Sequence, residues 1–199
     1  MDFHRSSDPA GGRLGIRRRI HYALVLLIFL VGIFQAGCSE KKGDPGKAGS
    51  IGTGVEVGQV APDFKVKNLK GGLTTLLQYR GKVVMVNFWA TWCGPCLAEM
   101  PSMEVMYQRY PRGDFEILAV SIDTIGEPPV RAFVEELNLS FPILMDNQFT
   151  LNDYYQVRVV PTSILIDRKG VVFQRVLGAK DWANPDTRIL LEKLIQAKG

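Results

Sequence analysis

Two cysteines three positions apart are the side chains of this sequence best suited to chemistry. Cys93 and Cys96 lie in the run Trp-Cys-Gly-Pro-Cys, between an apolar stretch and a segment with helical character. A cysteine that begins a helix faces free N–H groups and the positive end of the helix dipole, which lower its pKa below about 8.5. Cys96 follows one turn later on the same face, and Pro95 suits a first turn that needs no N–H. The pattern predicts a redox-active pair with Cys93 as the nucleophile.

Other uses of a Cys-x-x-Cys pair fit this sequence poorly. A zinc site needs about four ligands, but there is no second such pair, and the two histidines, His4 and His21, lie far from it. Haem attachment requires histidine directly after the second cysteine, and Leu97 stands there. A purely structural disulfide would gain little from closing so short a loop. We therefore expect redox chemistry and no metal.

The elements that must position the pair alternate between strands and helices. Apolar and β-branched runs predict strands at 64–66, 73–76, 83–89, 115–121, 141–145, 162–167 and 171–176. Helices are expected at 95–110, 129–137, 150–155 and from 185 onward, the last with Ile189, Leu190, Leu194 and Ile195 on its apolar side. This order predicts an α/β sandwich around a mixed sheet.

The N-terminal 38 residues have the layout of an export signal. Three arginines at 17–19 precede an apolar run at 23–34, and Ala36-Gly37 lead to Cys38. As a helix the run would reach roughly 18 Å, short of the roughly 30 Å hydrocarbon core. Ala-Gly-Cys resembles a bacterial lipoprotein box with Cys38 as the lipidated residue, although Gln35 replaces the usual leucine. The alternative is an uncleaved signal anchor, and both interpretations place the domain on the outer side of a membrane.

Charge and composition separate a linker from a domain. The net charge is +4, but the first 37 residues carry +3 of it through five arginines and two aspartates. The domain therefore lacks the basic surface expected of a nucleic-acid-binding protein. Residues 39–56 are rich in glycine and charge and predict a flexible linker, so the domain is expected to span 57–199.

The motifs together resemble those of the thioredoxin superfamily. The run from Phe88 to Cys96 and the later Val160-Pro161-Thr162 carry the resemblance. The opening Val-Ala-Pro-Asp-Phe at 60–64, and Glu99 and Pro101 after the cysteines, are similar to the membrane-anchored TlpA/ResA-like branch. This resemblance implies a thioredoxin-like three-layer α/β/α sandwich with a mixed central sheet. It also implies an N-terminal β-hairpin extension and a central helix–strand insert.

The resemblance assigns roles to further residues. Pro161 corresponds to a cis-proline beside the cysteines, and the residues implied to contact substrate are Trp92, Gly94, Pro95, Val160, Pro161 and Thr162. Glu99 corresponds to an acidic residue near the redox centre, on the same helical face as Cys96. Thioredoxins proper carry a buried aspartate where this chain has Asn87, so Glu99 is the expected base for Cys96. Pro101 is expected inside the helix, with a kink there.

The function implied is that of an extracytoplasmic thiol–disulfide oxidoreductase. We expect a reductase of disulfides in exported proteins, with apocytochrome c as a substrate that the resemblance suggests. No cofactor beyond the Cys93–Cys96 disulfide is expected, and a membrane thiol-transfer protein would supply the electrons. Three alternatives stay open at this point: a disulfide-forming oxidant, a thiol peroxidase, and a non-catalytic chaperone or adaptor.

Overall fold

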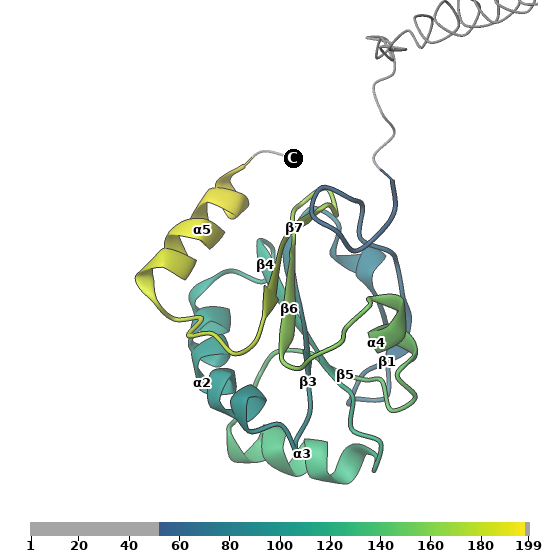
Figure 1. Ribbon diagram of the computed structural model, residues 1–199. Helices are drawn as coiled ribbons and strands as arrows, with labels where there is room; N and C mark the ends of the chain where they lie inside the picture. Colours follow the sequence, from purple (N-terminus) through teal and green to yellow (C-terminus); the bar gives the residue numbers. More distant parts are fainter. Residues whose placement is uncertain (1–51, 198–199) are drawn as a thin grey trace, which may run out of the picture. The chain divides into compact units, whose positions relative to one another are not determined.

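A five-stranded mixed sheet forms the centre of the computed structural model, which describes residues 52–197 (Figure 1). The strands run in the order β5-β4-β3-β6-β7. Their bounds are β3 Val83–Trp89, β4 Phe115–Ser121, β5 Ile143–Met145, β6 Thr162–Ile166 and β7 Val172–Leu177. The pairs β3–β4 and β4–β5 are parallel, whereas β6 is antiparallel to both β3 and β7. Every residue of β3 and β4 is buried, as continuous apolar strands require.

Helices and a hairpin cover the two faces of this sheet. The helices are α2 Gly94–Arg109, α3 Glu127–Glu136, α4 Thr150–Tyr154 and α5 Pro185–Gln196. Successive side chains of a strand point to opposite faces. Accordingly Trp89 of β3 packs on Phe133 of α3, whereas the preceding Phe88 packs on Tyr155 at the end of α4. Figure 1 shows α2 and α5 on one side of the sheet and α4 with β1 on the other, which confirms the predicted three layers.

The predicted N-terminal hairpin is present and closes one edge of the sheet. It consists of β1 Lys65–Lys67 and β2 Leu73–Thr75, followed by the 3-10 helix η1 Leu76–Tyr79. The hairpin loop lies against β5: Asn68 forms an antiparallel bridge with Leu144, and the Leu69 N–H donates to the Ile143 carbonyl at 2.9 Å. The helix–strand insert, α3 and β5, is thereby covered along its outer edge.

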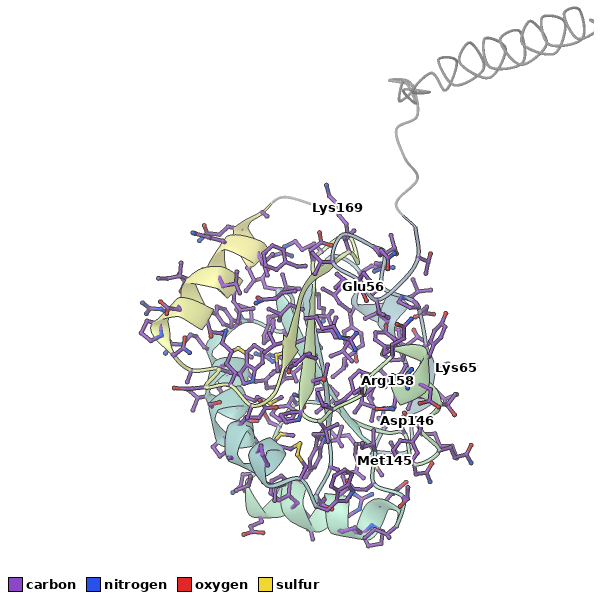
Figure 2. The ribbon with its side chains drawn as sticks, viewed as in Figure 1. Glu56, Lys65, Met145, Asp146, Arg158 and Lys169 are labelled. Atoms are coloured by element: carbon purple, nitrogen blue, oxygen red, sulfur yellow. A yellow bond between two sulfur atoms is a disulfide. The ribbon has the colours of Figure 1, made fainter. Side chains whose placement is uncertain are left out.

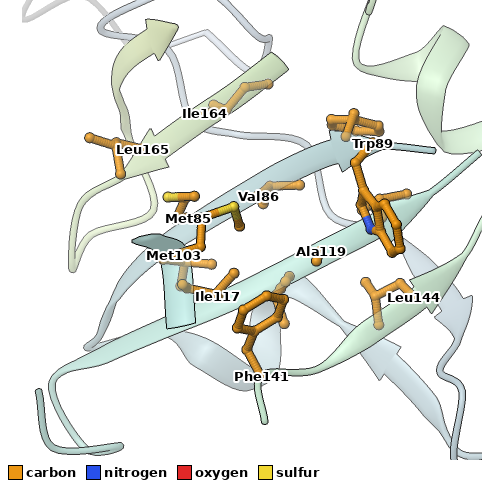
Figure 3. Packing of buried hydrophobic residues seen from close by; sticks show 14 of the residues in the cluster. Met85, Val86, Trp89, Met103, Ile117, Ala119, Phe141, Leu144, Ile164 and Leu165 are labelled. Atoms are coloured by element: carbon orange, nitrogen blue, oxygen red, sulfur yellow. The ribbon is translucent and has the colours of Figure 1, made fainter. Parts of the chain in front are cut away.

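The core beneath the cysteine-bearing helix includes two long, unbranched methionine side chains. Met85 of β3, Met103 of α2 and Ile117 of β4 are fully buried and point toward one another (Figure 3). Methionine fills irregular space between a helix and a sheet, and truncating such a residue to alanine removes about 2–5 kcal/mol of stability. This packing fixes α2 against the sheet and therefore fixes the position of its first turn.

Two expectations from the sequence need correction. In α5, Leu194 is buried and Leu190 and Ile195 are half-buried against the core, as predicted, whereas Ile189 is 46% exposed. The fully buried positions are Thr187 and Leu191, which the predicted side did not include. The packed domain also begins earlier than residue 57, since Thr53 forms a bridge with Val60 and Val55 is buried in the core.

Candidate active site: a disulfide at the start of α2

The two cysteines form a disulfide at the first turn of α2, where their spacing predicted it (Figure 2). Cys93 is the N-cap residue, and the Cys96 N–H donates a hydrogen bond to the Cys93 sulfur at 3.3 Å. Free N–H groups of a first turn stabilise negative charge, so this contact would favour a Cys93 thiolate in the reduced protein. The lowered Cys93 pKa itself stays a prediction.

Burial distinguishes the two sulfurs. Cys96 is fully buried, and Cys93 retains 6% exposure, so Cys93 is the more accessible of the two although less open than the sequence suggested. Its neighbour Trp92 is 64% exposed, and Gly94 and Pro95 are exposed as well. These three exposed residues flank Cys93, and their contact with a substrate stays a prediction.

The predicted proline loop lies beside the pair. The Val160–Pro161 peptide bond is cis, and the Val160 carbonyl oxygen lies 3.6 Å from the Cys93 sulfur. In the reduced protein a Cys93 thiol can donate a hydrogen bond across this distance. Thr162 is buried and its hydroxyl donates to the Val159 carbonyl at 2.7 Å. Its side chain therefore shapes the loop from inside, and the predicted contact of Thr162 with substrate stays a prediction.

Glu99 lies on the buried side of α2, as its spacing from Cys96 predicted. Only 3% of Glu99 is exposed, and burial raises the pKa of its carboxyl above the usual 4.5. Hydrogen bonds from Trp182, from Asn87 and from the Lys180 backbone oppose this rise in the pKa. A carboxyl with a raised pKa is a stronger proton acceptor than an ordinary glutamate, which is the property a base for Cys96 needs.

Asn87 connects this carboxyl to the strand that follows the cis-proline. Its amide donates to Glu99 Oε1 at 2.8 Å and to the Ser163 hydroxyl at 2.8 Å. Its own oxygen is buried and has no hydrogen-bond partner among residues 52–197. Asn87, which stands where thioredoxins carry an aspartate, is thus a donor that holds Glu99 in place. Its second partner, Ser163, lies in β6, two residues after Pro161.

No pattern in the sequence predicted the C-terminal contacts of Glu99. The Trp182 indole and the Lys180 backbone N–H both donate to Oε2 at 3.1 Å, from more than eighty residues away. Both residues lie in the segment between β7 and α5, which contains no motif. Their role follows only from the packing of that segment against α2.

Several predictions concern residues outside those that the structure describes. The export segment, Cys38 and most of the linker lie before residue 52 and stay predictions. Within residues 52–197, no helix has the length and apolarity needed to cross a bilayer. The kink expected at Pro101 also stays a prediction, although this proline does lie within α2.

Comparison with known proteins shows the family of the chain. The model of the AhpC/TSA family matches residues 57–175. The thiol-disulfide oxidoreductase ResA of Geobacillus kaustophilus is 46% identical over 128 residues, which cover 63% of this chain and 72% of ResA. The thioredoxin-like protein YneN of Bacillus subtilis is 42% identical over 121 residues, 60% of this chain and 70% of YneN.

A solved structure with the same fold extends the comparison. It is the thioredoxin domain of a thiol-disulfide oxidoreductase from Bacteroides vulgatus, which is 26% identical with a TM-score of 0.62. The match covers 71% of this chain and 99% of that domain. The resemblance to the thioredoxin superfamily is thereby confirmed. The chain belongs to the AhpC/TSA family and, within it, to the thioredoxin-like thiol–disulfide oxidoreductases.

Proposed function

We propose that this enzyme is a reductase that breaks disulfides in exported proteins and works on the outer side of a membrane. The observation that carries the proposal is the arrangement around one sulfur. Cys93 caps α2, lies 3.6 Å from the Val160 carbonyl, and is paired with a buried Cys96. In such an arrangement Cys93 is accessible to a partner as the nucleophile, and the buried Cys96 serves as the resolving thiol.

The first step uses the accessible sulfur. The Cys93 thiolate attacks one sulfur of the substrate disulfide; a Cys93–substrate bond forms, the substrate disulfide breaks, and its other sulfur leaves as a thiolate. The exposed Trp92 and the backbone at Val160 are the surfaces that hold the substrate chain during this attack. The result is a mixed disulfide.

The second step uses the buried sulfur. Cys96 transfers its proton to the Glu99 carboxylate and attacks the Cys93 sulfur, which forms the Cys93–Cys96 disulfide and breaks the bond to the substrate. The substrate sulfur leaves as a thiolate and takes up a proton. In total the substrate gains two electrons and the enzyme dithiol loses two, with no bound cofactor. A membrane thiol-transfer protein then reduces the enzyme disulfide by the same exchange.

The direction of exchange follows from which state of the pair is favoured. A disulfide carries no charge, whereas reduction creates thiols that ionise. A buried carboxyl on the same face of α2 as Cys96 disfavours a thiolate there, because like charges repel in a medium of low polarity. A stabilised Cys93 thiolate acts in the opposite direction, because it favours the reduced pair and raises the potential. For a reductase we expect the effect at Cys96 to prevail and the reduction potential to lie near that of thioredoxin, about −270 mV.

The potential separates a reductase from an oxidant. The pair is equilibrated with reduced and oxidised glutathione and then alkylated, and the tryptic peptide 83–109 is weighed. That peptide contains Cys93 and Cys96 but not Cys38. A value near −120 mV, typical of a strong oxidant, would reverse the proposed direction.

Apocytochrome c is the substrate that we propose within this class. Cys96→Ala removes the resolving thiol, so mixed disulfides with Cys93 accumulate and can be identified by mass spectrometry. The double variant Cys93→Ala/Cys96→Ala is the matched control and should trap nothing. Recovery of peptides with the haem-binding Cys-x-x-Cys-His sequence supports the assignment. A set of trapped partners without such peptides overturns it and leaves general thiol repair.

The membrane tether rests on the sequence of the first 38 residues. We propose that Cys38 carries a lipid, and labelling cells with a radioactive fatty acid tests this in the wild-type protein and in Cys38→Ser. Label on the wild type alone supports lipidation. An unlabelled protein that stays in the membrane fraction indicates a signal anchor instead. An unlabelled protein in the soluble fraction contradicts the tether.

Two further functions differ from exchange in what they require of the pair. A thiol peroxidase would consume hydrogen peroxide rapidly in the absence of any protein disulfide. A chaperone or adaptor would keep its activity in vivo when Cys93→Ser removes the nucleophile. We expect slow peroxide consumption and complete loss of activity in Cys93→Ser.

A further inference from the structure

Asp123 is a buried carboxylate that lies just past the end of β4, in the loop that leads to α3. Its side chain is fully buried, yet none of the ion pairs within residues 52–197 involves it. Burying an acidic group without a cation is unfavourable unless hydrogen bonds compensate for the lost water. The partners that Asp123 has instead therefore indicate what it does.

Those partners lie in the turn that leads to Cys93. The Thr91 N–H donates to both carboxylate oxygens of Asp123, at 3.2 and 3.1 Å, and the Thr91 hydroxyl donates at 2.5 Å. The Ser121 hydroxyl donates to the other side of the carboxylate at 2.8 Å. Through these hydrogen bonds Asp123 holds Thr91 next to Ser121, the last residue of β4.

The turn that Asp123 holds spans residues 90–93 and ends at the nucleophile, Cys93. The Cys93 N–H donates to the Ala90 carbonyl at 3.2 Å, which closes a turn with Thr91 and Trp92 at its centre. Cys93 is also the cap of α2, so its position is set from two sides: by α2 after it and by this turn before it. Cys96, inside α2, is held by the core beneath the helix. The turn is therefore the part of the site whose movement would separate the two sulfurs.

We propose that Asp123 is a positioning residue for the dithiol: by holding Thr91 it keeps Cys93 where Cys96 can close the disulfide. Two thiols in one chain form a disulfide in proportion to the effective concentration of one near the other. A turn freed from Asp123 samples more conformations, so Cys93 spends less time within reach of Cys96. The disulfide then closes more slowly and is less stable relative to the dithiol. The inference rests on the proposed function only in assigning thiol–disulfide exchange to this pair.

The test compares Asp123→Asn and Thr91→Val with a matched control in the full-length protein. Asp146 is another buried carboxylate; it accepts the N–H groups of Leu151 and Asn152 and so caps α4 rather than the active-site turn (Figure 2). Asp146→Asn should therefore weaken the fold without moving Cys93. The two measurements are the equilibrium constant of the pair with glutathione, from the alkylated peptide 83–109, and the free energy of unfolding in urea.

Asp123→Asn and Thr91→Val should each lower the equilibrium constant for disulfide formation about three- to tenfold, the latter corresponding to about 30 mV. The double variant should change it no more than the larger single effect, because both remove one contact. Asp146→Asn should leave the constant within about 1.5-fold while lowering stability, because the Asp146 carboxylate contacts the backbone of α4 and not Thr91. If Asp123→Asn does not fold, Thr91→Val decides alone.

An unchanged or increased constant in Thr91→Val and in folded Asp123→Asn overturns the proposal and leaves Asp123 a merely structural residue. A fall in the control equal to that in Asp123→Asn overturns it as well. Failure of the wild-type pair to exchange with glutathione at all would instead contradict the proposed function.

Discussion

The indole N–H of Trp182 donates a 3.1 Å hydrogen bond to Oε2 of Glu99, which joins the segment before α5 to the helix that carries both cysteines. Trp182 is 1% exposed and Glu99 is 3% exposed, so water cannot replace this bond without opening the core. The C-terminal part of the domain thereby contributes to the electrostatics of a site whose sequence motif lies about ninety residues earlier.

Replacing Trp182 by phenylalanine should both destabilise the protein and raise the pKa of Glu99. Trp182→Phe keeps most of the ring but removes the donor, so we expect a loss of about 1.5–3 kcal/mol at neutral pH, the range for a hydrogen bond to a charged group. The pKa of Glu99 should rise further, because this hydrogen bond lowers it. Urea unfolding and carboxyl-carbon NMR measure the two effects. Trp92→Phe, at an exposed position, should change neither, and an unaltered Glu99 pKa in Trp182→Phe contradicts the prediction.

Stability should depend on pH through Glu99. The raised pKa means that the folded protein binds this proton more tightly than the unfolded chain does, so protonation stabilises the fold. That contribution is fully present below the unfolded pKa of about 4.5 and is lost as the pH rises through the folded pKa. Relative to Glu99→Gln, the oxidised wild type should lose up to about 1.4 kcal/mol per pH unit across this window.

The comparison with Glu99→Gln isolates this one group. Burial also raises the pKa of Asp146, but that carboxyl is present in both proteins and cancels in the difference. The glutamine itself meets the donors at Trp182 and Lys180 less well, which adds an offset that does not vary with pH. A difference in stability that stays constant between pH 4 and 8 would show that the folded pKa of Glu99 is not raised.

Glu99→Gln should also slow the release of substrate from the mixed disulfide. An amide cannot take the Cys96 proton, so the resolving step should fall by about 10²–10⁴, the usual contribution of a positioned base. Stopped-flow measurement of product release gives this rate, and attack by Cys93 should be much less affected. Glu104→Gln is the control on the same helix, since that carboxylate binds Ser140 rather than the active site. Equal resolving rates in Glu99→Gln and the wild type would exclude Glu99 as the base.

The acidity of Cys93 can be measured directly. In reduced Cys96→Ala the rate of alkylation at position 93, followed on the peptide 83–109, should rise with pH around a midpoint below about 8.5. The reason is that first-turn N–H groups, among them the one at position 96 that now contacts the sulfur, favour the thiolate. Cys93→Ala, with Cys96 alone, should react far more slowly because that sulfur is fully buried. A midpoint at or above the value of free cysteine would remove the basis for assigning Cys93 as nucleophile.

The sequence predicted the strands at the centre of the sheet to the residue. β3 and β4 are buried on both faces, so their continuous apolar runs begin and end where the strands do. The face of α5 could not be obtained in this way, because a helix with apolar residues at 189–191 and 194–195 has more than one plausible buried side. Packing against the sheet and the inward Thr187 decide it, and neither is visible in the local pattern.

In the candidate site, too, the local features could be predicted from the sequence and the contacts between distant segments could not. The spacing of Cys93 and Cys96 predicted the redox pair, and that of Glu99 allowed it to share the helical face of Cys96, whereas the role of Glu99 came from the resemblance to the family. The cis peptide bond before Pro161 was predicted from the resemblance to the family. The contacts from Trp182 and Asp123 cross from other parts of the chain, and no periodicity or motif connects them to α2.

The hairpin loop that lies along β5 has a consequence for clients that are still unfolding or folding. Such chains expose strand-forming segments, and an open sheet edge would capture them by adding a strand. The Leu69 N–H already donates to the Ile143 carbonyl, and Asn68 is bridged to Leu144, so another chain cannot pair with β5 at these positions. A strand-forming segment of a client would therefore find the Ile143 carbonyl already paired at this edge, which removes one site for non-productive binding away from the cysteines.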